Sequence, residues 1–348
     1  MHKEFSIENK VIGINHKPFI IAEVAQSHDG NLNIAHSFID LCANAGADAI
    51  KFQTHIASEE STINDEWRIK FTHYNESRYE YWKRMEFSKE EWKGLIEHCK
   101  QKDIIFLSTP FSETAVDLLE DLGIGAWKLA SGELSNIRMI DHIIKTGKPI
   151  LISSGMSPWE EIDEVIERVK KNNNPFGLFQ CNSSYPTPVE KVGLNIITEM
   201  LHKYNVPIGL SDHSATIFSP LAAITLGASI IEVHVTFHES AFGPDVPASL
   251  NPNELVSLVE GAKYIHYAKM NPIDKDKEAI EMQKMRTLFT RSMVAAKNLK
   301  KNHVITANDI VYKKPGGGIS AKDETKVIGK ELLIDIPRSE IIKWENLK

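Results

Sequence analysis

The sequence predicts an α/β fold, a (β/α)8 TIM barrel followed by a small, mostly-β module. Over the first 240 residues, short apolar runs rich in β-branched residues alternate with longer segments of helical period. Continuous apolar runs of this length are typical of strands buried on both faces, as in a parallel sheet covered by helices. Eight such runs occur, which is the number that closes a barrel, and the pattern changes after about residue 268.

The predicted strands are separated by Gly, Pro or Asp. They cover residues 19–24, 49–53, 104–109, 126–130, 149–154, 177–182, 207–213 and 229–235. Amphipathic stretches at 34–44, 113–122 and 162–170 predict helices between them. A doubly wound open sheet is the structural alternative, but no GxGxxG or GxxxxGKS/T motif follows the first strand. The aromatic and charged segment 67–92 is interpreted as an insertion over one mouth of the barrel.

The C-terminal part differs in pattern from the first 270 residues. From residue 291 onward, the short strand-like pieces SMVAAKNL, ITANDIVY and LLIDI are separated by polar and Gly-rich segments. A module of roughly 60 residues is marginal alone, so we expect it to lean on another surface. The predicted organisation is a barrel at 1–270, a linker at 271–286 and the module at 287–348.

The composition is that of an ordinary globular protein, with 42% hydrophobic and 25% charged residues. The net charge is −7 and no basic stripe occurs, so nucleic acid is not an expected partner. The three cysteines form no CxxC pair, which argues against a disulfide framework or a cysteine zinc site and favours a reducing compartment. No signal peptide or membrane-spanning apolar run is present, and we expect a soluble cytoplasmic protein.

Polar residues cluster at the C-terminal ends of all eight predicted strands, where an α/β barrel forms its active site. One polar strand end is explained by solvation, whereas eight of eight predict a functional site. In chain order these residues are Glu23, Lys51, Gln53, Ser108, Thr109, Lys128, Ser131, Glu133, Ser153, Ser154, Asn182, Ser183, Ser184, Tyr185, Ser211, Asp212, His213, Glu232 and His234.

Two lysines stand within apolar runs. Burying Lys51 or Lys128 without an anionic partner is costly, so with hydroxyls around them they predict a cradle for a phosphate and a carboxylate. Those hydroxyls belong to Thr109, Ser131, Ser153, Ser183 and Ser211. Two other interpretations stay open. Either lysine can form an ion pair with a neighbouring glutamate, or it can have a lowered pKa and form a Schiff base.

His213 and His234 end adjacent predicted strands, so their imidazoles can converge on one divalent metal such as Mn, Zn or Fe. A site with few protein ligands leaves positions for substrate and water. The alternative for each is a hydrogen-bonded core histidine. The carboxylates of Glu23, Glu133 and Glu232 can bind sugar hydroxyls or act as acid or base, and ion pairs with the lysines are their alternative.

Ten ordered motifs resemble the sialic acid synthase family, the bacterial nonulosonate synthases, over nearly the whole chain. They are IAEVAQSHDGNL, GADAIKFQTH, LSTPF, KLASGE, SSGM, SSYPTP, IGLSDHS, EVHVTF, GPDVPASL and KKPGGGIS. The resemblance implies a TIM barrel joined to a C-terminal antifreeze-like (SAF, β-clip) domain. It also implies a homodimer in which that domain is swapped and covers the partner's active site.

The reaction implied by the resemblance condenses phosphoenolpyruvate with an open-chain 2-acetamido sugar, favoured as N-acetylmannosamine, to a nine-carbon 3-deoxy-2-keto acid and phosphate. His213 and His234 would bind Mn²⁺, with Mg²⁺ or Co²⁺ as alternatives. Glu133 and Glu23 would be the catalytic carboxylates, with Glu133 handling the proton. Phosphoenolpyruvate would be held by Lys51, Thr109, Lys128, Ser131, Ser153, Ser183 and Ser211, and the sugar by Gln53, Tyr185, Asp245 and Lys314.

Two departures from the family pattern bear on the sugar. Lys314 stands where the family often has an arginine that reaches the sugar's N-acetyl group, and a lysine cannot reproduce that planar contact. The stretch EVHVTFHES also replaces the commoner EKHFT-type strand end. A 2,4-diacetamido-trideoxy hexose, giving a legionaminic- or pseudaminic-type acid, is the close alternative. A Schiff-base pyruvate aldolase, a synthase for phosphorylated sugars and a non-catalytic sugar-phosphate binding protein are the others.

Overall fold

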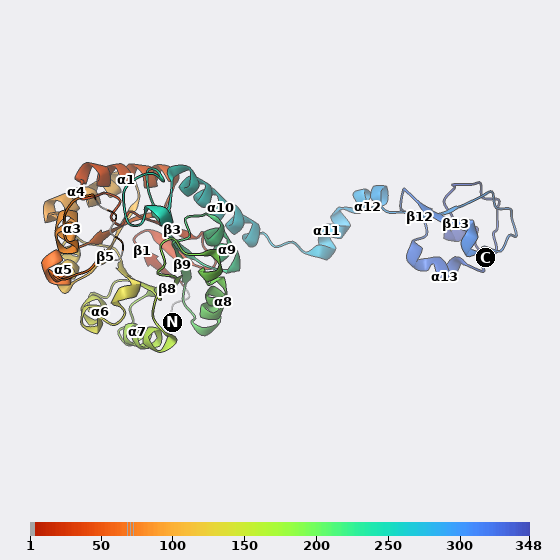
Figure 1. Cartoon of the computed structure of the whole chain (residues 1–348). Helices are drawn as coiled ribbons and strands as arrows, with labels where there is room; N and C mark the ends of the chain where they lie inside the picture. Colours follow the sequence, from red (N-terminus) through yellow and green to blue (C-terminus); the bar gives the residue numbers. More distant parts are fainter. Residues whose placement is uncertain (1–3, 68, 70, 72) are drawn as a thin grey trace. The chain divides into compact units, whose positions relative to one another are not determined.

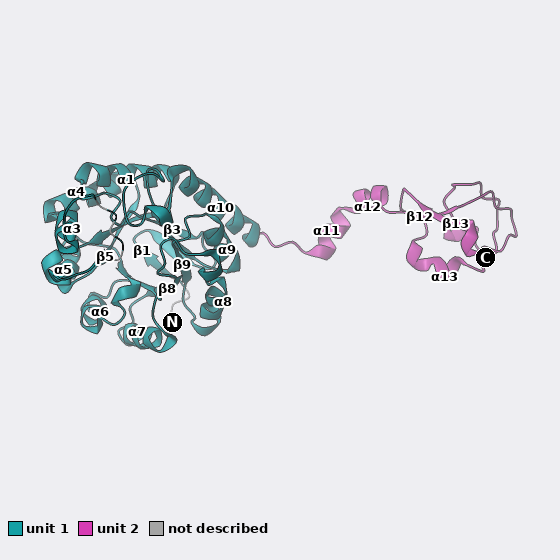
Figure 2. Ribbon diagram, viewed as in Figure 1, with its two compact units in different colours: residues 1–270 teal, residues 271–348 magenta. Residues whose placement is uncertain are grey.

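The computed structural model describes residues 4–67, 69, 71 and 73–348. Residues 68, 70 and 72 of the predicted insertion therefore lie outside the described residues. The chain divides into two compact units, Met1–Met270 and Asn271–Lys348 (Figure 2).

Eight parallel strands close into a barrel at the centre of the first unit, and helices surround them (Figure 1). Each strand pairs with the next, and the last pairs with both its predecessor and the first, so the sheet closes on itself. The predicted barrel is confirmed, and every predicted strand end lies within one residue of the observed one. The strands are β3 (Phe19–Glu23), β4 (Ala49–Thr54), β5 (Ile105–Pro110), β6 (Trp127–Leu129), β7 (Ile150–Ser153), β8 (Phe176–Cys181), β9 (Ile208–Asp212) and β10 (Ile230–Val235).

A helix follows every barrel strand. Asn31 caps the first by accepting hydrogen bonds from two backbone amides, and Ser88 with Glu91 forms a capping box at another. Among the described residues, no helix has the length and apolar content needed to cross a membrane. The helices are α1 (Leu32–Ala45), α4 (Lys89–Gln101), α5 (Glu113–Asp121), α6 (Ile137–Ile144), α7 (Trp159–Lys171), α8 (Leu194–Lys203), α9 (Phe218–Leu226) and α10 (Pro252–Met270), with the shorter α2 (Ala57–Glu60) and α3 (Arg78–Met85) between β4 and α4.

The inside of the barrel is built in layers, because alternate residues of each strand point to the same face. Its lower layer is apolar and includes Ile21, Ala49, Leu107, Ala126, Leu151, Phe179 and Ile230. Two positions further along the same strands stand Glu23, Lys51, Thr109, Lys128, Ser153, Cys181 and Glu232. One alternation therefore fills the barrel with apolar side chains below and gathers polar side chains above them.

An antiparallel hairpin precedes the barrel, formed by β1 (Glu4–Ile7) and β2 (Lys10–Gly13). The sequence does not predict this hairpin, because alternation over four residues is too short a signal. Phe5, Ile7 and Ile12 are buried and pack in the same apolar cluster as the lower layer of the barrel. The hairpin thus closes the N-terminal end of the barrel.

The second unit has a small apolar core and little regular structure. Strands β12 (Ser292–Ala295) and β13 (Ile310–Lys313) pair antiparallel, and α13 (Glu324–Val327) follows them. The predicted strand-like piece at 332–336 forms only isolated bridges. The predicted linker contains α11 (Lys275–Glu281), and α12 (Gln283–Phe289) begins within it. The core residues are Met293, Ala295, Leu299, Ile305, Ile310, Ile319, Val327, Leu332, Ile336 and Ile342.

Candidate active site

The C-terminal mouth of the barrel holds two cavities with different surroundings. The inner cavity, of about 50 Å³, lies on the upper polar layer and is lined by both barrel lysines. The outer cavity, of about 480 Å³, is formed largely by the loops. Gln53, Tyr185 and His234 line both cavities, so the two form neighbouring parts of one site.

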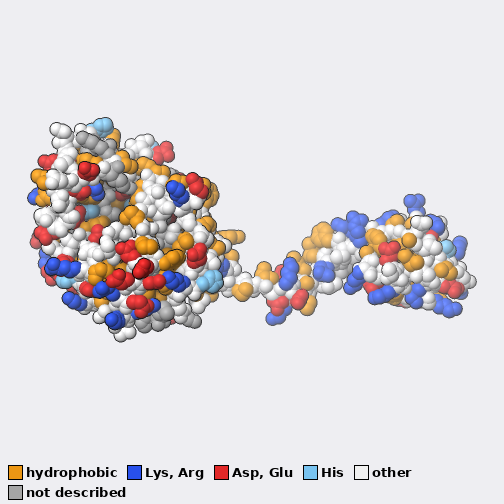
Figure 3. Space-filling view, turned by 60° about the horizontal axis from the view of Figure 1, so that its bottom comes forward, with side chains coloured by type: hydrophobic (Ala, Val, Ile, Leu, Met, Phe, Trp, Pro, Cys, Tyr) orange, Lys and Arg blue, Asp and Glu red, His pale blue; other side chains and the backbone are white. Residues whose placement is uncertain are grey.

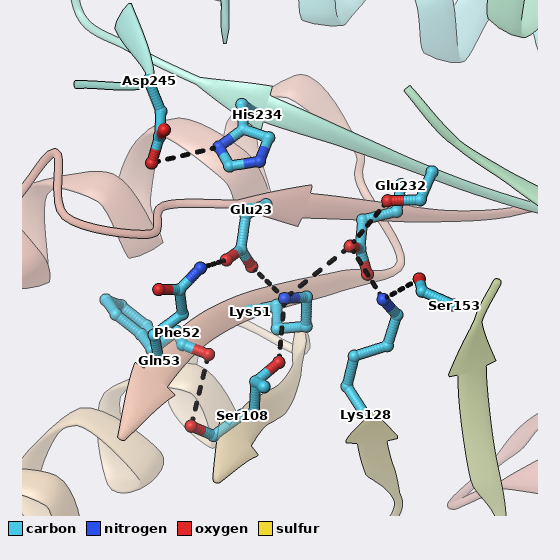
Figure 4. Close-up of polar contacts among 12 residues, drawn as sticks. Glu23, Lys51, Phe52, Gln53, Ser108, Lys128, Ser153, Glu232, His234 and Asp245 are labelled. Atoms are coloured by element: carbon cyan, nitrogen blue, oxygen red, sulfur yellow. Dashed lines mark hydrogen bonds and ion pairs between the residues drawn. The ribbon is translucent and has the colours of Figure 1, made fainter. Parts of the chain in front are cut away.

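Four buried charges form a network at the inner cavity (Figure 4). Lys51 Nζ lies 2.6 Å from Glu23 Oε2 and 3.7 Å from Glu232 Oε1. Lys128 Nζ lies 3.2 Å from the same Glu232 oxygen. Because each residue is at most 4% exposed, the two positive charges depend on the two carboxylates for their stability. The ion-pair interpretation of both lysines is what the structure shows.

The pKa values in this network move in different directions. Burial raises the pKa of Glu23 to about 7 against the opposing effect of Lys51, and Glu232 contributes to the rise. Burial acts on Glu232 in the same sense, but Lys128 and Lys51 outweigh it and hold the pKa of Glu232 below its usual value. For Lys51, burial alone would lower the pKa, but the two glutamates outweigh it and raise the pKa. Lys51 is therefore protonated at neutral pH, unlike a Schiff-base lysine.

Hydroxyl groups surround the network, as predicted. Lys128 Nζ donates to Ser153 Oγ at 2.6 Å, and Lys51 Nζ donates to Thr109 Oγ1 at 3.2 Å. Ser211 Oγ donates to Glu232 Oε1 at 3.2 Å. These hydroxyls therefore give the inner cavity further hydrogen-bonding groups beside its charges.

Ser131 and Ser183 lie together across two loops, with their Oγ atoms 3.1 Å apart. Gly155 in the loop after β7 makes this packing fit, because a Cβ atom there would lie 1.9 Å from Ser131 Cβ. The residue also has a φ of +35°. Position 155 therefore leaves no room for a side chain, and the contact between Ser131 and Ser183 depends on that space.

His213 and His234 approach each other, with ring centroids 5.0 Å apart, and the Tyr185 ring lies 4.0 Å from that of His213. His213 Nδ1 donates to the Asn182 carbonyl at 2.6 Å, which leaves Nε2 as a lone-pair donor. Burial lowers the pKa of His213 to about 4, so this ring is neutral at pH 7. His234 Nδ1 lies 4.0 Å from Asp245 Oδ2 (Figure 4).

A neutral imidazole fixed through its other nitrogen suits metal coordination, so the chemistry of the pair fits a divalent cation. Among the residues that the structure describes, no group of three or more His, Cys, Asp or Glu side chains is arranged to hold a metal ion.

The outer cavity brings together four residues predicted to act on a sugar, namely Gln53, Glu133, Tyr185 and Asp245. Glu133 lies in a 3-10 turn after β6 and accepts a hydrogen bond from Asn136 at 3.1 Å. Burial raises the pKa of Glu133, and the nearby Glu60 adds to the rise. This carboxyl is thus suited to carry a proton closer to neutral pH than an exposed glutamate.

Other residues of the outer cavity do not appear in the sequence prediction, namely His55, Glu59, Glu60, Asp65, Arg78, Trp82 and Phe111. Arg78 and Trp82 belong to α3, so the insertion does contribute to the mouth of the barrel. The available signal was the motif KFQTH, whose final residue is His55. Lys314 belongs to the other unit, where it is exposed and its Nζ lies 4.9 Å from the centroid of the Phe289 ring.

Comparison with known proteins identifies the family. The model of the NeuB family matches residues 38–274, and that of the SAF domain matches residues 290–348. The chain belongs to the NeuB family. This confirms the resemblance to the sialic acid synthases and the nature of the C-terminal module.

Named relatives of this NeuB family chain make different products. It is 34% identical to the N,N'-diacetyllegionaminic acid synthase of Campylobacter jejuni over 94% of this chain and 99% of that protein. It is 30% identical to the N-acetylneuraminate-9-phosphate synthase of Homo sapiens, over 96% and 94%. The crystal structure of the N-acetylneuraminic acid synthetase of Leptospira borgpetersenii, in complex with citrate, matches with a TM-score of 0.71 and 34% identity, over 81% and 96%. The family is that of nonulosonic acid synthases.

The charge network makes a prediction for Glu232→Gln, which replaces the carboxylate between two buried ammonium groups with a neutral amide. We expect the free energy of unfolding to fall by about 3–5 kcal/mol, because Lys51 and Lys128 lose a shared partner. Urea unfolding followed by circular dichroism measures this. Inorganic phosphate should recover stability more in the variant than in the original protein, because an anion can replace the lost charge.

The matched control is Glu133→Gln, whose carboxyl contacts Asn136 instead of a lysine. We expect its stability to change by less than about 1 kcal/mol, with no added response to phosphate. Equal stability of Glu232→Gln and the original protein would contradict the role given to Glu232.

Proposed function

We propose that this NeuB family protein condenses phosphoenolpyruvate with an open-chain 2-acetamido sugar to give a nine-carbon 3-deoxy-2-keto acid and phosphate. The observation that carries the proposal is the pair of buried lysines, Lys51 and Lys128, surrounded by hydroxyls beneath a larger polar cavity. N-Acetylmannosamine is the first candidate acceptor. A 2,4-diacetamido-trideoxy hexose is the close alternative, which the similarity to a legionaminic acid synthase supports.

The inner cavity is the proposed site of phosphoenolpyruvate. Its phosphate and carboxylate would take hydrogen bonds and charge from Lys51, Thr109, Lys128, Ser131, Ser153, Ser183 and Ser211. Both lysines already have carboxylate partners, so the incoming anion must exchange with them. Glu23 is suited to this exchange, because its raised pKa lets it take up a proton as Lys51 turns to the phosphate.

The outer cavity is the proposed site of the sugar, positioned by Gln53, Tyr185 and Asp245. In the homodimer proposed below, Lys314 of the partner subunit would be a further sugar-binding residue. Its charged lining contains one arginine, which pairs with Asp65 at 3.2 Å, against five carboxylates. This lining supports an acceptor without a phosphate group, because a phosphate there would face mainly like charges. The raised pKa of Lys51 disfavours the Schiff-base aldolase.

We propose that His213 and His234 hold a divalent cation, with Mn²⁺ as the first candidate and Mg²⁺ or Co²⁺ as alternatives. When bound, such a cation supplies Lewis-acid polarisation of the aldehyde. The chain's own contribution is to keep the rings in place: the Asn182 carbonyl fixes the tautomer of His213, and burial keeps that ring neutral.

In the proposed reaction, C3 of phosphoenolpyruvate forms a bond to the aldehyde carbon, and the carbonyl oxygen takes a proton from Glu133. The cation that develops at C2 is captured by water, which loses a proton. The resulting tetrahedral carbon expels phosphate by cleavage of its C–O bond, leaving the 2-keto group. Glu232 lies beside both inner lysines and keeps a lowered pKa, so its negative charge can stabilise the transient positive charge at C2.

We also propose a domain-swapped homodimer in the cytoplasm. Residues 1–270 carry 24 basic and 36 acidic side chains, whereas residues 271–348 carry 16 and 11. Figure 3 shows basic side chains spread over the visible face of the second unit. Exposed apolar side chains also follow four barrel strands, namely Met156, Val189, Phe218 and Phe242. Opposite charge and an apolar rim support a partner's C-terminal unit as the cover of the mouth.

All three cysteines are unpaired and buried, which fits a reducing compartment.

Phosphate release from phosphoenolpyruvate tests the proposed function. The assay uses metal-stripped protein, with Mn²⁺ restored or withheld, across a panel of unphosphorylated and phosphorylated 2-acetamido sugars. We expect metal-dependent release with one unphosphorylated sugar, whose identity names the acceptor. Binding of phosphoenolpyruvate without release for any sugar, or release only with a phosphorylated one, would contradict the proposed acceptor class.

The pKa of Glu23 makes a prediction for pH. Since its pKa is raised to about 7, Glu23 is protonated below that pH and leaves Lys51 free for the anion, whereas above it the ionised carboxylate competes. We expect the affinity for phosphoenolpyruvate to fall as the pH rises through about 7, by up to about tenfold per unit for one linked proton. Calorimetric titration between about pH 6 and pH 9 measures this. Glu23→Gln should remove the dependence and Glu133→Gln should keep it. A dependence unchanged in Glu23→Gln would contradict the exchange.

Light scattering tests the homodimer, and we expect twice the mass of the chain. A partner's unit bound to the mouth through opposite charges should dissociate more readily as salt is added, because salt screens exposed charges. A monomer with full activity would contradict the proposal.

A further inference from the structure

His55 lines the cavity proposed for the sugar, and its side chain is buried and restrained by neighbouring residues. It directly follows β4 and its side chain is 4% exposed. The ring is stacked between Trp82, at 4.1 Å and 22°, and Phe111, at 4.6 Å and 11°. These two aromatic rings come from the insertion and from the loop after β5. Together they fix the plane of the imidazole.

The two nitrogens of His55 have different partners. Nδ1 lies 2.7 Å from Glu60 Oε1, and because a carboxylate accepts, Nδ1 carries the proton of this hydrogen bond. With the proton on Nδ1, Nε2 is an acceptor, and it takes a hydrogen bond from Gln26 Nε2 at 3.2 Å. Nε2 also lies 3.1 Å from Gln53 Oε1, which is an acceptor too, so the Gln26 amide group supplies the donor between them. Gln26 Nε2 also donates to Gln53 Oε1. The oxygen of the Gln53 amide therefore faces Gln26 and His55.

The nitrogen of the same amide points the other way. Gln53 Nε2 donates to Glu23 Oε1 at 2.8 Å, as Figure 4 shows, and Glu23 holds Lys51. A Gln53 amide turned by half a rotation would place its oxygen against the Glu23 carboxylate and its nitrogen against the Gln26 donor. Both contacts would then be repulsive. The orientation of Gln53 therefore depends on what its oxygen meets.

We propose that His55 is a positioning residue which, held by Glu60, fixes Gln26 and, through the Gln26 amide nitrogen, the amide of Gln53 between the two cavities. The proposal rests on the proposed function, in which Gln53 positions the acceptor sugar. His55 acts through Gln26 and Gln53, and the ion pair between Glu23 and Lys51 stays in place without it. Loss of the Nε2 contact should therefore affect the acceptor more than phosphoenolpyruvate.

Three variants of His55 separate the contributions of the ring and of each nitrogen. His55→Phe keeps the stacked ring and removes both nitrogens. The shorter amide of His55→Asn reaches about as far as Nδ1 and can still meet Glu60. The longer amide of His55→Gln reaches about as far as Nε2, where its oxygen can accept from Gln26. We expect kcat/KM for the acceptor to fall at least about tenfold in the Phe and Asn variants and to stay within about threefold in the Gln variant.

The apparent affinity for phosphoenolpyruvate should stay within about threefold in all three variants. The proposal is overturned if the Gln variant is as impaired as the Phe variant, or if the Asn variant alone recovers activity, because the Glu60 contact would then be the one that matters. A parallel loss of acceptor use, phosphoenolpyruvate affinity and Tm would show a purely structural role.

Nuclear magnetic resonance of protein labelled with ¹⁵N in glutamine side chains tests the same point without activity. The Gln53 signal is assigned by its loss in Gln53→Leu. Its amide protons should exchange slowly with water in the original protein and in His55→Gln, and faster in His55→Phe and His55→Asn. Equal exchange in all four proteins would overturn the positioning role. Absence of any synthase activity in the original protein would instead contradict the proposed function and leave this readout intact.

Discussion

Two ammonium groups and two carboxylates inside a closed barrel are the constraint on which the rest of the site depends. Their charges come from four strands, β3, β4, β6 and β10, so the network forms only when the sheet has closed. Removing any one charge leaves a buried ion without compensation. The same four groups must nevertheless change partners if an anion binds among them. The site is thus held together by contacts that its proposed substrate has to replace.

The neighbouring outer cavity is built from different elements than the inner one. Most of its side chains come from loops and short helices, with Gln53 and His234 from strands β4 and β10, so its shape depends on several segments that are far apart in the sequence. Within the NeuB family, the named relatives differ in the acid they make. In α/β barrels, strand residues at the base of the site and loop residues around its mouth can separate the reaction from the specificity.

Much of this could be predicted from the sequence, for physical reasons that also explain the failures. Buried parallel strands are continuous apolar runs, and a lysine or histidine within such a run is conspicuous, so Lys51, Lys128, His213 and His234 were found. Glu232 remained between two interpretations, because only the fold shows that its carboxylate lies between both lysines. His55 was missed because its role depends on rings from two other segments. The acceptor cannot be predicted, since no single motif forms the outer cavity.

The hairpin of β1 and β2 gives the barrel a closed floor, with Phe5, Ile7 and Ile12 packed against the lower layer. Both cavities of the site lie at the C-terminal mouth, so the substrates and products of the proposed reaction would enter and leave there. In the proposed reaction, phosphate is released at the deepest point, beneath the newly formed acid. Because phosphate would lie deeper than the nine-carbon acid, the acid would have to leave first or move aside before phosphate could be released. Turnover would then depend on the order in which the two products leave as well as on the chemical steps at the inner cavity.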